Sequence, residues 1–363
     1  MFVNLTAFKG TGGIEKVCRS IYKVLDEESE INSFFDYRVI STHDSNENFQ
    51  EKYAKKNRIF NANKSKLLAV IASLWYGKFS DTILFSHINL APIVLLLKTI
   101  YPHKKIIIIA HGIEIWSKLN WIKQKALKIS DKIIAVSNFT KESIVENHKL
   151  DKEKIIVINN CLDPFIKAPK LFEKPTDLML KYNLSPNDFV LFTLTRLNSN
   201  EKYKGYDKVI EALATIVPNH PKFKYIIGGK GDLQEILRVE SLITKYKLKE
   251  NVNLIGFIDE EELSSHFLLA DTYVMPSLGE GFGIVFIEAA YYGLPVIAGN
   301  KDGSVDALMN GQLGKLIDPE NIDELNDVIL NTKWNNNKVE TSYLTNKTFG
   351  YEVFKSKIIN AVS

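Results

Sequence analysis

Two glutamates, Glu280 and Glu288, stand eight residues apart in the stretch GEGFGIVFIEAAYYGLP (279–295), which also carries three closely spaced glycines. The run after Gly283 has no helix breaker, so we expect a helix that begins near this glycine. The unpaired N–H groups at the start of a helix attract anions such as phosphate. Glu280 in the loop and Glu288 in the second helical turn would both accept hydrogen bonds from hydroxyl groups of one ligand. A ligand that combines phosphates with hydroxyls, such as a nucleotide sugar, fits this pattern.

Two cations follow a predicted strand in the stretch LTRLNSNEKYKGYDKVIEAL (194–213). Arg196 comes directly after the strand, and Lys204 stands just before a glycine and an amphipathic helix. Fixed cations at a strand end and at a helix start can neutralise a diphosphate, and they matter most where negative charge grows during a reaction. Lys202 competes with Lys204 for this role, and a solvated surface would also explain both lysines.

Two further loops follow predicted strands. In HGIEIW, His111 stands at a strand end before a glycine, where its imidazole can reach into a crevice, although a lone histidine often has only a structural role. In KGTGGIEKV, Gly12 and Gly13 open a helix and can admit a phosphate or a sugar closely, with a plain tight turn as the alternative. Neither this loop nor GGKGDL has the G-x-G-x-x-G spacing of a dinucleotide site, which argues against a nicotinamide-dependent dehydrogenase.

The elements that must position these loops follow an alternating pattern. Short apolar runs alternate with helical ones such as GIEKVCRSIYKVL, APIVLLLKTI and NFTKESIVENH, and this alternation is typical of a parallel sheet covered on both faces. The predicted strands are FVNLTAF, YRVIST, TILFS, KKIIIIA, KIIAVS and KIIVIN, then FVLFTLT, KYIIGG, VNLIGF, TYVMP, PVIAG and GKLID. We therefore predict two doubly wound α/β domains, whose ligands bind beyond the carboxyl ends of the strands.

The stretch DPFIKAPKLFEKP (163–175) separates the two halves of this pattern. Its three prolines and weak apolar periodicity predict a linker. We expect an N-terminal acceptor-binding Rossmann-like domain over residues 1–165 and a C-terminal domain for the nucleotide sugar over 166–345. The helical run at the end of the chain, 346–363, has no strand after it, and we expect it to pack back toward the N-terminal domain.

The overall composition is that of an ordinary soluble enzyme. The chain has 363 residues, more than one hydrophobic core usually organises, with 45% hydrophobic and 25% charged residues. Cys18 and Cys161 are too few for a metal cluster, and no secretory signal precedes the first strand, so we expect a reduced, cytoplasmic protein. The longest apolar stretch, residues 90–100, is too short to span a bilayer.

Several stretches together resemble a known family. GEGFGIVFIEAAYYGLPVIA resembles the E-x7-E signature of the retaining glycosyltransferases of family 4, which have the GT-B fold, and TRLNSNEKYKGYDKVIEAL resembles that family's arginine and lysine-glycine donor motif. GTGGIEKV, HGIE, IIAVSNFTKE and LIGFIDEEEL occur in the family's order as well, so the resemblance extends over nearly the whole chain. It implies two Rossmann-like domains facing a central cleft, and transfer of a sugar from a nucleotide diphosphate with its anomeric configuration retained.

The same resemblance implies roles for individual residues. The residues implied in catalysis are His111, near the sugar and the acceptor, Arg196 and Lys204, on the diphosphate, and Glu280, on the transferred sugar. Those implied in donor binding also include Gly12 and Gly13 from the other domain, Gly256 and Phe257 at the nucleobase, the loop of Gly281, Phe282, Gly283 and Ile284 at the sugar and its phosphates, and Glu288 at the ribose.

The sequence departs from the family pattern at four places. The spacer from Arg196 to Lys204 is slightly long, which leaves the choice between Lys202 and Lys204 open. Thr195 stands where a glycine usually precedes the arginine, Asn160-Cys161 replaces an asparagine-glycine turn, and GNKDGSVDAL lacks the usual glycine-x-proline-glutamate. None of these changes removes a charged group from the predicted site. They leave open whether the donor is UDP- or GDP-linked and whether the acceptor is a glycan or a lipid-linked acceptor. The abundant Lys, Asn and Ile suggest an AT-rich microbial genome, which favours a role in surface polysaccharide or lipopolysaccharide assembly.

The chemistry expected is front-face displacement, in which the leaving diphosphate itself takes the acceptor proton. No D-x-D triplet occurs in the chain, so we expect no metal, and no cofactor beyond the nucleotide sugar as co-substrate. We expect no nucleic-acid partner. The alternatives are a nucleotide-sugar epimerase or a phosphorylase-like enzyme on the same fold and, least favoured, an inactive binding subunit, which would be expected to have lost the charged residues of the site.

The charge is unevenly distributed, because residues 1–165 carry 24 Lys and Arg against 17 Asp and Glu, while the remainder is acidic. Within this half, residues 51–79 place Lys52, Lys55, Lys56, Arg58, Lys64 and Lys66 before a helix with apolar residues at 67, 70, 71, 74 and 75, on one face. A buried core helix explains this face most simply. The alternative is peripheral docking on anionic headgroups, which would bring a lipid-diphosphate acceptor to His111.

Overall fold

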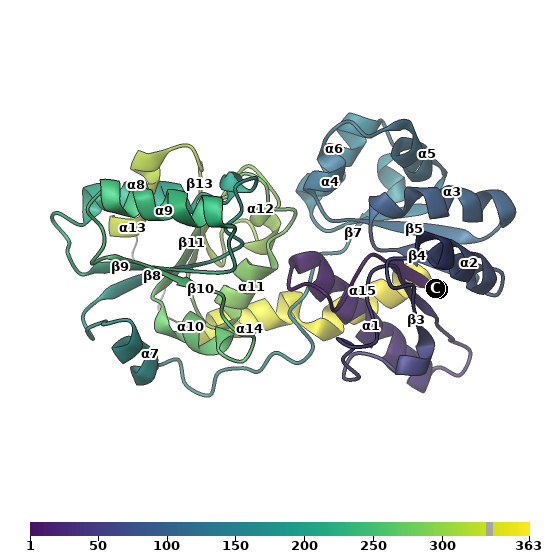
Figure 1. The fold of residues 1–363 in the computed structure, drawn as a ribbon, viewed down its shortest axis with the longest axis horizontal. Coiled ribbons are helices and arrows are strands. Elements are labelled where there is room, and N and C mark those ends of the chain that lie inside the picture. Colours follow the sequence, from purple (N-terminus) through teal and green to yellow (C-terminus); the bar gives the residue numbers. More distant parts are fainter. Residues whose placement is uncertain (332–336) are drawn as a thin grey trace. The chain divides into compact units, whose positions relative to one another are not determined.

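The computed structural model describes residues 1–331 and 337–363, which form two compact units (Figure 1). The first unit comprises Met1–Ile166 and Phe349–Ser363, and the second comprises Lys167–Thr348. The linker stretch 163–175 contains no helix or strand, and it includes the point where the chain passes from the first unit to the second.

The first unit is built on a parallel sheet of seven strands in the order β3-β2-β1-β4-β5-β6-β7. Its strands are β1 (Phe2–Asn4), β2 (Val39–Ser41), β3 (Ile59–Asn61), β4 (Thr82–Phe85), β5 (Lys105–Ala110), β6 (Lys132–Ala135) and β7 (Ile155–Val157). Its helices are α1 (Gly13–Ile31), α2 (Lys66–Gly77), α3 (Ala91–Ile100), α4 (Ile113–Trp116), α5 (Trp121–Ile129), α6 (Asn138–His148) and α15 (Tyr351–Val362). The interior strand β5 is almost entirely apolar and buried, as expected for a parallel sheet covered on both faces.

Helices cover both faces of this sheet. On one side α2 packs against α3, and α3 against α5; on the other side α1 packs against α15 (Figure 1). The helical run at the end of the chain therefore completes the first unit, where the Lys355 ammonium lies 2.7 Å from the Glu27 carboxylate of α1.

The second unit is built on a parallel sheet of six strands in the order β10-β9-β8-β11-β12-β13. Its strands are β8 (Phe189–Leu194), β9 (Phe223–Gly228), β10 (Val252–Gly256), β11 (Thr272–Met275), β12 (Val296–Gly299) and β13 (Gly314–Ile317). Its helices are α7 (Thr176–Lys181), α8 (Tyr206–Ile216), α9 (Leu233–Lys245), α10 (Leu263–Leu269), α11 (Ile284–Tyr291), α12 (Ser304–Ala307), α13 (Ile322–Asn331) and, up to Thr348, α14 (Lys338–Phe349).

The two doubly wound α/β folds predicted from the sequence are confirmed, and each sheet reverses its strand order once. The reversal lies between β1 and β4 in the first unit and between β8 and β11 in the second. Crevices at the carboxyl ends of the strands on either side of such a point are where open α/β sheets bind ligands. In the second unit, this places the candidate site between the loop after β8 and the loop after β11.

Two features of the first unit differ from the expectation. The short strand β3 was not predicted, because its three residues lie in a lysine-rich stretch. The interpretation of α2 as a buried core helix is wrong for its largest side chains, since Leu67, Ile71 and Trp75 are 70%, 53% and 65% exposed. The fully buried residues of α2 are small instead, Ala69, Ala72, Ser73 and Gly77, while Val70, Leu74 and Tyr76 pack partly against the core.

Candidate active site

An ion pair between Lys204 and Glu280 joins the two loops at the switch point of the second unit. Their side chains are only 14% and 13% exposed, so the pair is largely shielded from solvent. Burial by itself lowers the pKa of Lys204, but the adjacent Glu280 carboxylate outweighs it, and the net shift is upward. Lys204 is therefore a fixed ammonium at the carboxyl edge of the sheet.

The structure separates the two lysines that the sequence left as alternatives. Lys202 and Lys204 lie in one 3-10 turn, Lys202–Lys204, but Lys202 is exposed and Lys204 turns toward Glu280. Arg196, two residues after the end of β8, lies 2.8 Å from the Glu201 carboxylate with its side chain 68% exposed. Most of its guanidinium therefore remains open to solvent and to an anion.

The backbone brings the two loops into direct contact. Gly205 has φ +77°, and a Cβ there would lie 2.3 Å from the carbonyl oxygen of Pro276, so only glycine fits. The Leu278 N–H donates to the Tyr203 carbonyl at 2.9 Å. Burial raises the pKa of the Tyr203 hydroxyl, so this side chain stays neutral beside the ion pair. These contacts fix the position of Lys204 relative to the loop after β11.

A buried carboxylate, Asp302, holds the loop after β11 from the other side. One of its oxygens accepts the backbone N–H of Glu280 at 2.7 Å and the Ser277 hydroxyl at 2.9 Å, and the other accepts the Ser304 N–H at 2.9 Å. The Gly303 N–H donates to the Glu280 carbonyl at 2.8 Å. Desolvation raises the pKa of Asp302, and although its hydrogen bonds lower the pKa, the net shift is upward. Both backbone groups of Glu280 are thus fixed.

Helix α11 begins at this loop and carries the second glutamate of the pair. Gly283, at its N-cap, has φ +86°, and no side chain caps the helix start. The first N–H groups of α11 therefore have no side-chain partner at the cap and are available to an anion. Glu288 lies in the second turn and is 5% exposed. The polypeptide between Gly281 and Ile284 presents backbone rather than charged side chains.

Strand β10 ends at the same edge of the sheet. Gly256, its last residue, has φ +73° and open space where a Cβ would be. Phe257 follows, and its side chain is 55% exposed. An exposed aromatic ring at the carboxyl edge of this sheet offers a surface on which a nucleobase can stack.

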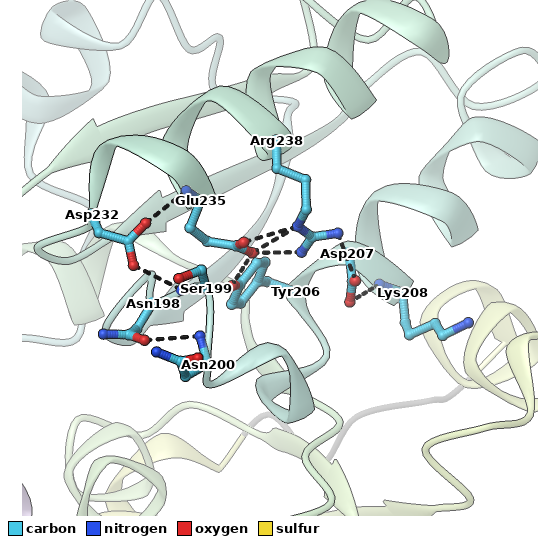
Figure 2. Close-up of polar contacts among 9 residues, drawn as sticks. All are labelled: Asn198, Ser199, Asn200, Tyr206, Asp207, Lys208, Asp232, Glu235 and Arg238. Carbon is cyan, nitrogen blue, oxygen red and sulfur yellow. Dashed lines mark hydrogen bonds and ion pairs between the residues drawn. The ribbon is translucent and has the colours of Figure 1, made fainter.

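A polar network behind the loop after β8 fixes it to α9 (Figure 2). Asp232, at the N-cap of α9, accepts the Ser199 N–H at 2.8 Å as well as a first-turn N–H of its own helix. Leu197 forms a bridge with Gly231. The start of the loop is therefore fixed to the segment that leads into α9.

The fully buried Glu235 carboxylate fixes the other end of the loop. It accepts the Tyr206 hydroxyl at 2.5 Å and the Arg238 guanidinium at 2.6 Å (Figure 2). Arg238 also donates to Asp207 at 3.1 Å. Since Tyr206 and Asp207 directly follow Gly205, the network supports the turn that carries Lys204. Sequence reasoning did not single out any residue of this network.

In the first unit, His111 lies at the carboxyl end of β5, beside the switch point. Its Nε2 lies 2.7 Å from the Ser86 carbonyl oxygen, which can only accept, so Nε2 carries the proton and Nδ1 is an acceptor. Burial lowers the pKa of His111 to about 4 and that of His87, whose ring stacks at 6.3 Å, also to about 4. Both imidazoles are therefore neutral at physiological pH.

The glycine loop after β1 lies at the same edge of this sheet. Gly12 is the N-cap of α1, and Gly13 is its first residue. A Cβ at Gly12 would lie 2.6 Å from the Glu15 carboxylate, so this carboxylate already occupies the space over the helix start. An anion approaching Gly12 and Gly13 would have to displace the Glu15 side chain.

Several residues of the candidate site escaped the sequence analysis. Asp302 was quoted only as part of a departure from a family pattern, and Glu201 only as a letter in the cation stretch. A signal for Asp302 is the glycine after it, which makes a tight approach to the loop of Glu280. No comparable signal marks the buried role of Glu235, because an i,i+3 pair such as Glu235 with Arg238 is common on exposed helix faces and its other partner, Tyr206, comes from α8.

Residues 1–331 and 337–363 contain neither a cluster of metal-ligating side chains nor a membrane-spanning helix. No three His, Cys, Asp or Glu side chains there are grouped to hold a metal ion. No helix in these ranges is long and apolar enough to cross a membrane.

Both units match glycosyltransferase families. Residues 11–164 match the family described as Glycosyltransferase Family 4, and residues 177–342 match the one described as Glycosyl transferases group 1. With two Rossmann-like units that each carry such a domain, the chain is a glycosyltransferase of the GT-B fold. The enzyme class and the fold expected from the sequence are thus confirmed.

The chain is also similar to individual proteins of known sequence. The gpi3 subunit of phosphatidylinositol N-acetylglucosaminyltransferase from Schizosaccharomyces pombe is 29% identical over 228 residues, 61% of this chain and 44% of that protein. This chain thus spans less than half the length of that relative. An uncharacterized 41.2 kDa protein in the cps region of Klebsiella pneumoniae is 27% identical over 292 residues, 76% of this chain and 75% of that one.

A solved structure shares the whole fold. HepE from Anabaena, in complex with UDP and glucose, superposes with a TM-score of 0.77 and covers 99% of both chains. At 19% sequence identity this likeness concerns the fold alone.

Proposed function

We propose that this chain transfers a sugar from a nucleotide diphosphate sugar to an acceptor hydroxyl and retains the anomeric configuration. The observation that carries the proposal is the meeting of Lys204, Glu280 and the start of α11 at one switch point, with Arg196 exposed at the same strand edge. Cations and free N–H groups suit the diphosphate, and the carboxylates suit sugar hydroxyls.

In the proposed reaction the bond between the anomeric carbon and the phosphate oxygen breaks first. Lys204, Arg196 and the N–H groups of α11 stabilise the negative charge that develops on the leaving diphosphate. The acceptor oxygen then bonds to the anomeric carbon on the same face, and its proton passes to the departing phosphate. In this scheme no metal takes part. Glu280 positions the sugar, and Glu288 binds the ribose.

For the substrates we propose a UDP- or GDP-linked sugar as the donor and a glycan or lipid-linked acceptor. HepE was solved with UDP and glucose, and the gpi3 relative is named for a phosphatidylinositol acceptor. We assign the acceptor to the first unit, where neutral His111 offers Nδ1 as a hydrogen-bond acceptor. A place at the cytoplasmic face of a membrane, in surface polysaccharide assembly, would follow from such an acceptor.

The test is a turnover assay with UDP- and GDP-sugars, a lipid-diphosphate sugar as acceptor, and EDTA. We expect release of the nucleoside diphosphate in EDTA, and a product whose anomeric configuration, read by NMR, is that of the donor. Activity that EDTA abolishes and Mg²⁺ restores would contradict the metal-free reaction. An epimerase would instead convert the donor without an acceptor, and an inactive subunit would bind the nucleotide without turnover.

A further inference from the structure

Helix α2 buries its small residues, packs Val70, Leu74 and Tyr76 partly against the core, and leaves its remaining large apolar residues in solvent. The α2 apolar face, as we name it, consists of Leu67, Leu68, Ile71, Trp75 and, just after the helix, Phe79, with 70%, 47%, 53%, 65% and 68% exposure. The side facing the core is filled closely, because a Cβ at Gly77 would lie 2.7 Å from Leu97 of α3. No rotation of α2 could bury the large side chains without losing this contact. A contiguous exposed apolar patch of this kind marks an interaction site.

The face has the composition of a surface that enters a membrane interface. Its residues recur every three or four positions, and the Trp75 and Phe79 rings contact each other edge to face at 6.0 Å. Aromatic rings of this kind favour the boundary between headgroups and acyl chains. The face is one stripe on one helix, which is the geometry of a helix lying in the plane of an interface.

The charges around the α2 apolar face indicate what kind of partner covers it. Residues 62–80 contain no Asp or Glu, but Lys64 and Lys66 stand at the start of α2 and Lys78 at its end. All three are exposed, and no ion pair with an acidic side chain involves them in the described parts of the chain. Lys9 adds to this cluster, since the neighbouring Lys64 ammonium lowers its pKa. A second copy of the chain would bring these cations together, whereas anionic headgroups would neutralise them.

The basic residues singled out from the sequence are mostly engaged elsewhere. Lys55 pairs with Glu30, and Arg58 with Asp36. The Lys52 ammonium lies over an aromatic ring of its own unit. The lysines that flank α2 are therefore better placed to meet a charged surface than those of residues 52–58.

We propose that the α2 apolar face is a docking surface for a bilayer that contains anionic lipids. The large apolar side chains enter the interface, and Lys64, Lys66 and Lys78 contact the headgroups. Because α2 follows β3, its first residues lie at the carboxyl edge of the sheet, the edge that carries His111. Docking there would present a membrane-bound acceptor to this edge, a consequence that rests on the proposed function; the docking itself does not.

The experiment is co-sedimentation of the full chain with vesicles of phosphatidylglycerol and phosphatidylcholine, and with phosphatidylcholine alone, at low and high salt. We expect binding to the anionic vesicles that high salt weakens. The double variant I71S/W75S should bind at least about tenfold more weakly. Changing Lys64, Lys66 and Lys78 to glutamine should weaken binding about fivefold for each lysine.

Matched controls lie on the same unit. Phe34, 99% exposed in the loop after α1, is changed to serine, and Lys52, Lys55 and Lys56 are changed together to glutamine; both variants should bind like the wild type. The proposal is overturned if anionic vesicles are not bound at low salt, or if controls and α2 variants behave alike. It is also overturned if sedimentation equilibrium shows a dimer that W75S dissociates. Nucleotide binding in solution, measured in parallel, should be unchanged in every α2 variant, so a failure of donor binding is recognised separately.

Discussion

Replacing Glu280 by glutamine should strengthen the binding of a free nucleoside diphosphate. In the structure the Lys204 ammonium is already held by the Glu280 carboxylate, so an incoming diphosphate must compete with that carboxylate for the same cation. The glutamine side chain has nearly the same size and can still accept a hydrogen bond, but it carries no charge. The substitution therefore frees Lys204 without opening a cavity.

The size of the effect follows from the shielding of the pair. A hydrogen bond to a charged group contributes about 1.5 to 3 kcal/mol, and a neutral one about half of that. With side chains only 14% and 13% exposed, solvent weakens the pair little, so the difference is about 0.75 to 1.5 kcal/mol. That corresponds to a Kd lowered about 3- to 12-fold.

Isothermal titration calorimetry with UDP and GDP measures this change directly. The control is Glu240→Gln, which removes one exposed carboxylate from α9 of the same unit and should leave the Kd unchanged. Turnover should fall in Glu280→Gln although binding improves, because the sugar loses its carboxylate partner. A Kd that stays the same or rises in Glu280→Gln would show that Lys204 is not shared with the ligand.

Three further predictions concern stability and pH. Lys204→Met should lower the free energy of unfolding by about 3 to 5 kcal/mol in urea titration, because it leaves the largely buried Glu280 carboxylate unpaired. Lys202→Met should change it by no more than about 0.5 kcal/mol. Equal effects of the two substitutions would contradict the assignment of Lys204 as the buried partner. Asp302→Asn should cost about 1 to 3 kcal/mol and reduce turnover, since one of its oxygens becomes a donor facing N–H groups; unchanged values would remove it from the site. The free energy of unfolding should fall as the pH drops from 6.5 toward 4, because in this range only the unfolded chain protonates His87 and His111. Each histidine should contribute up to about 1.4 kcal/mol per pH unit. If His87→Gln leaves the slope of the unfolding free energy against pH unaltered, the prediction is contradicted.

The sequence was sufficient for the fold because apolar runs and helical spacing are local properties. Helices α3 and α6 begin and end at the residues expected, and the two doubly wound sheets follow from the alternation of elements. Strand β3 was missed because three residues give too short a pattern. The orientation of α2 was misjudged because periodicity shows that an apolar stripe exists but not which residues its neighbours accept. At Gly77, Leu97 of α3 approaches so closely that even a Cβ would be crowded.

The site could be predicted only in part, because some of its residues act through partners that are distant in the sequence. The glycine loop and its glutamates carry a local signal, as does the cation stretch. The choice between Lys202 and Lys204 depends on a 3-10 turn and on a carboxylate more than seventy residues away, which no local pattern reports. Asp302 and Glu235 act by accepting hydrogen bonds from distant backbone and side chains, and such partners become visible only in three dimensions.

A crystal structure of the full chain with UDP or GDP tests the central claim most directly. We predict density for the diphosphate within hydrogen-bond distance of the Lys204 ammonium and of the N–H groups at the start of α11, with the Arg196 guanidinium turned toward it. The ribose should lie against Glu288 and the base against Phe257. A nucleotide bound away from Lys204 and the start of α11 would contradict the assignment of this switch point as the donor site.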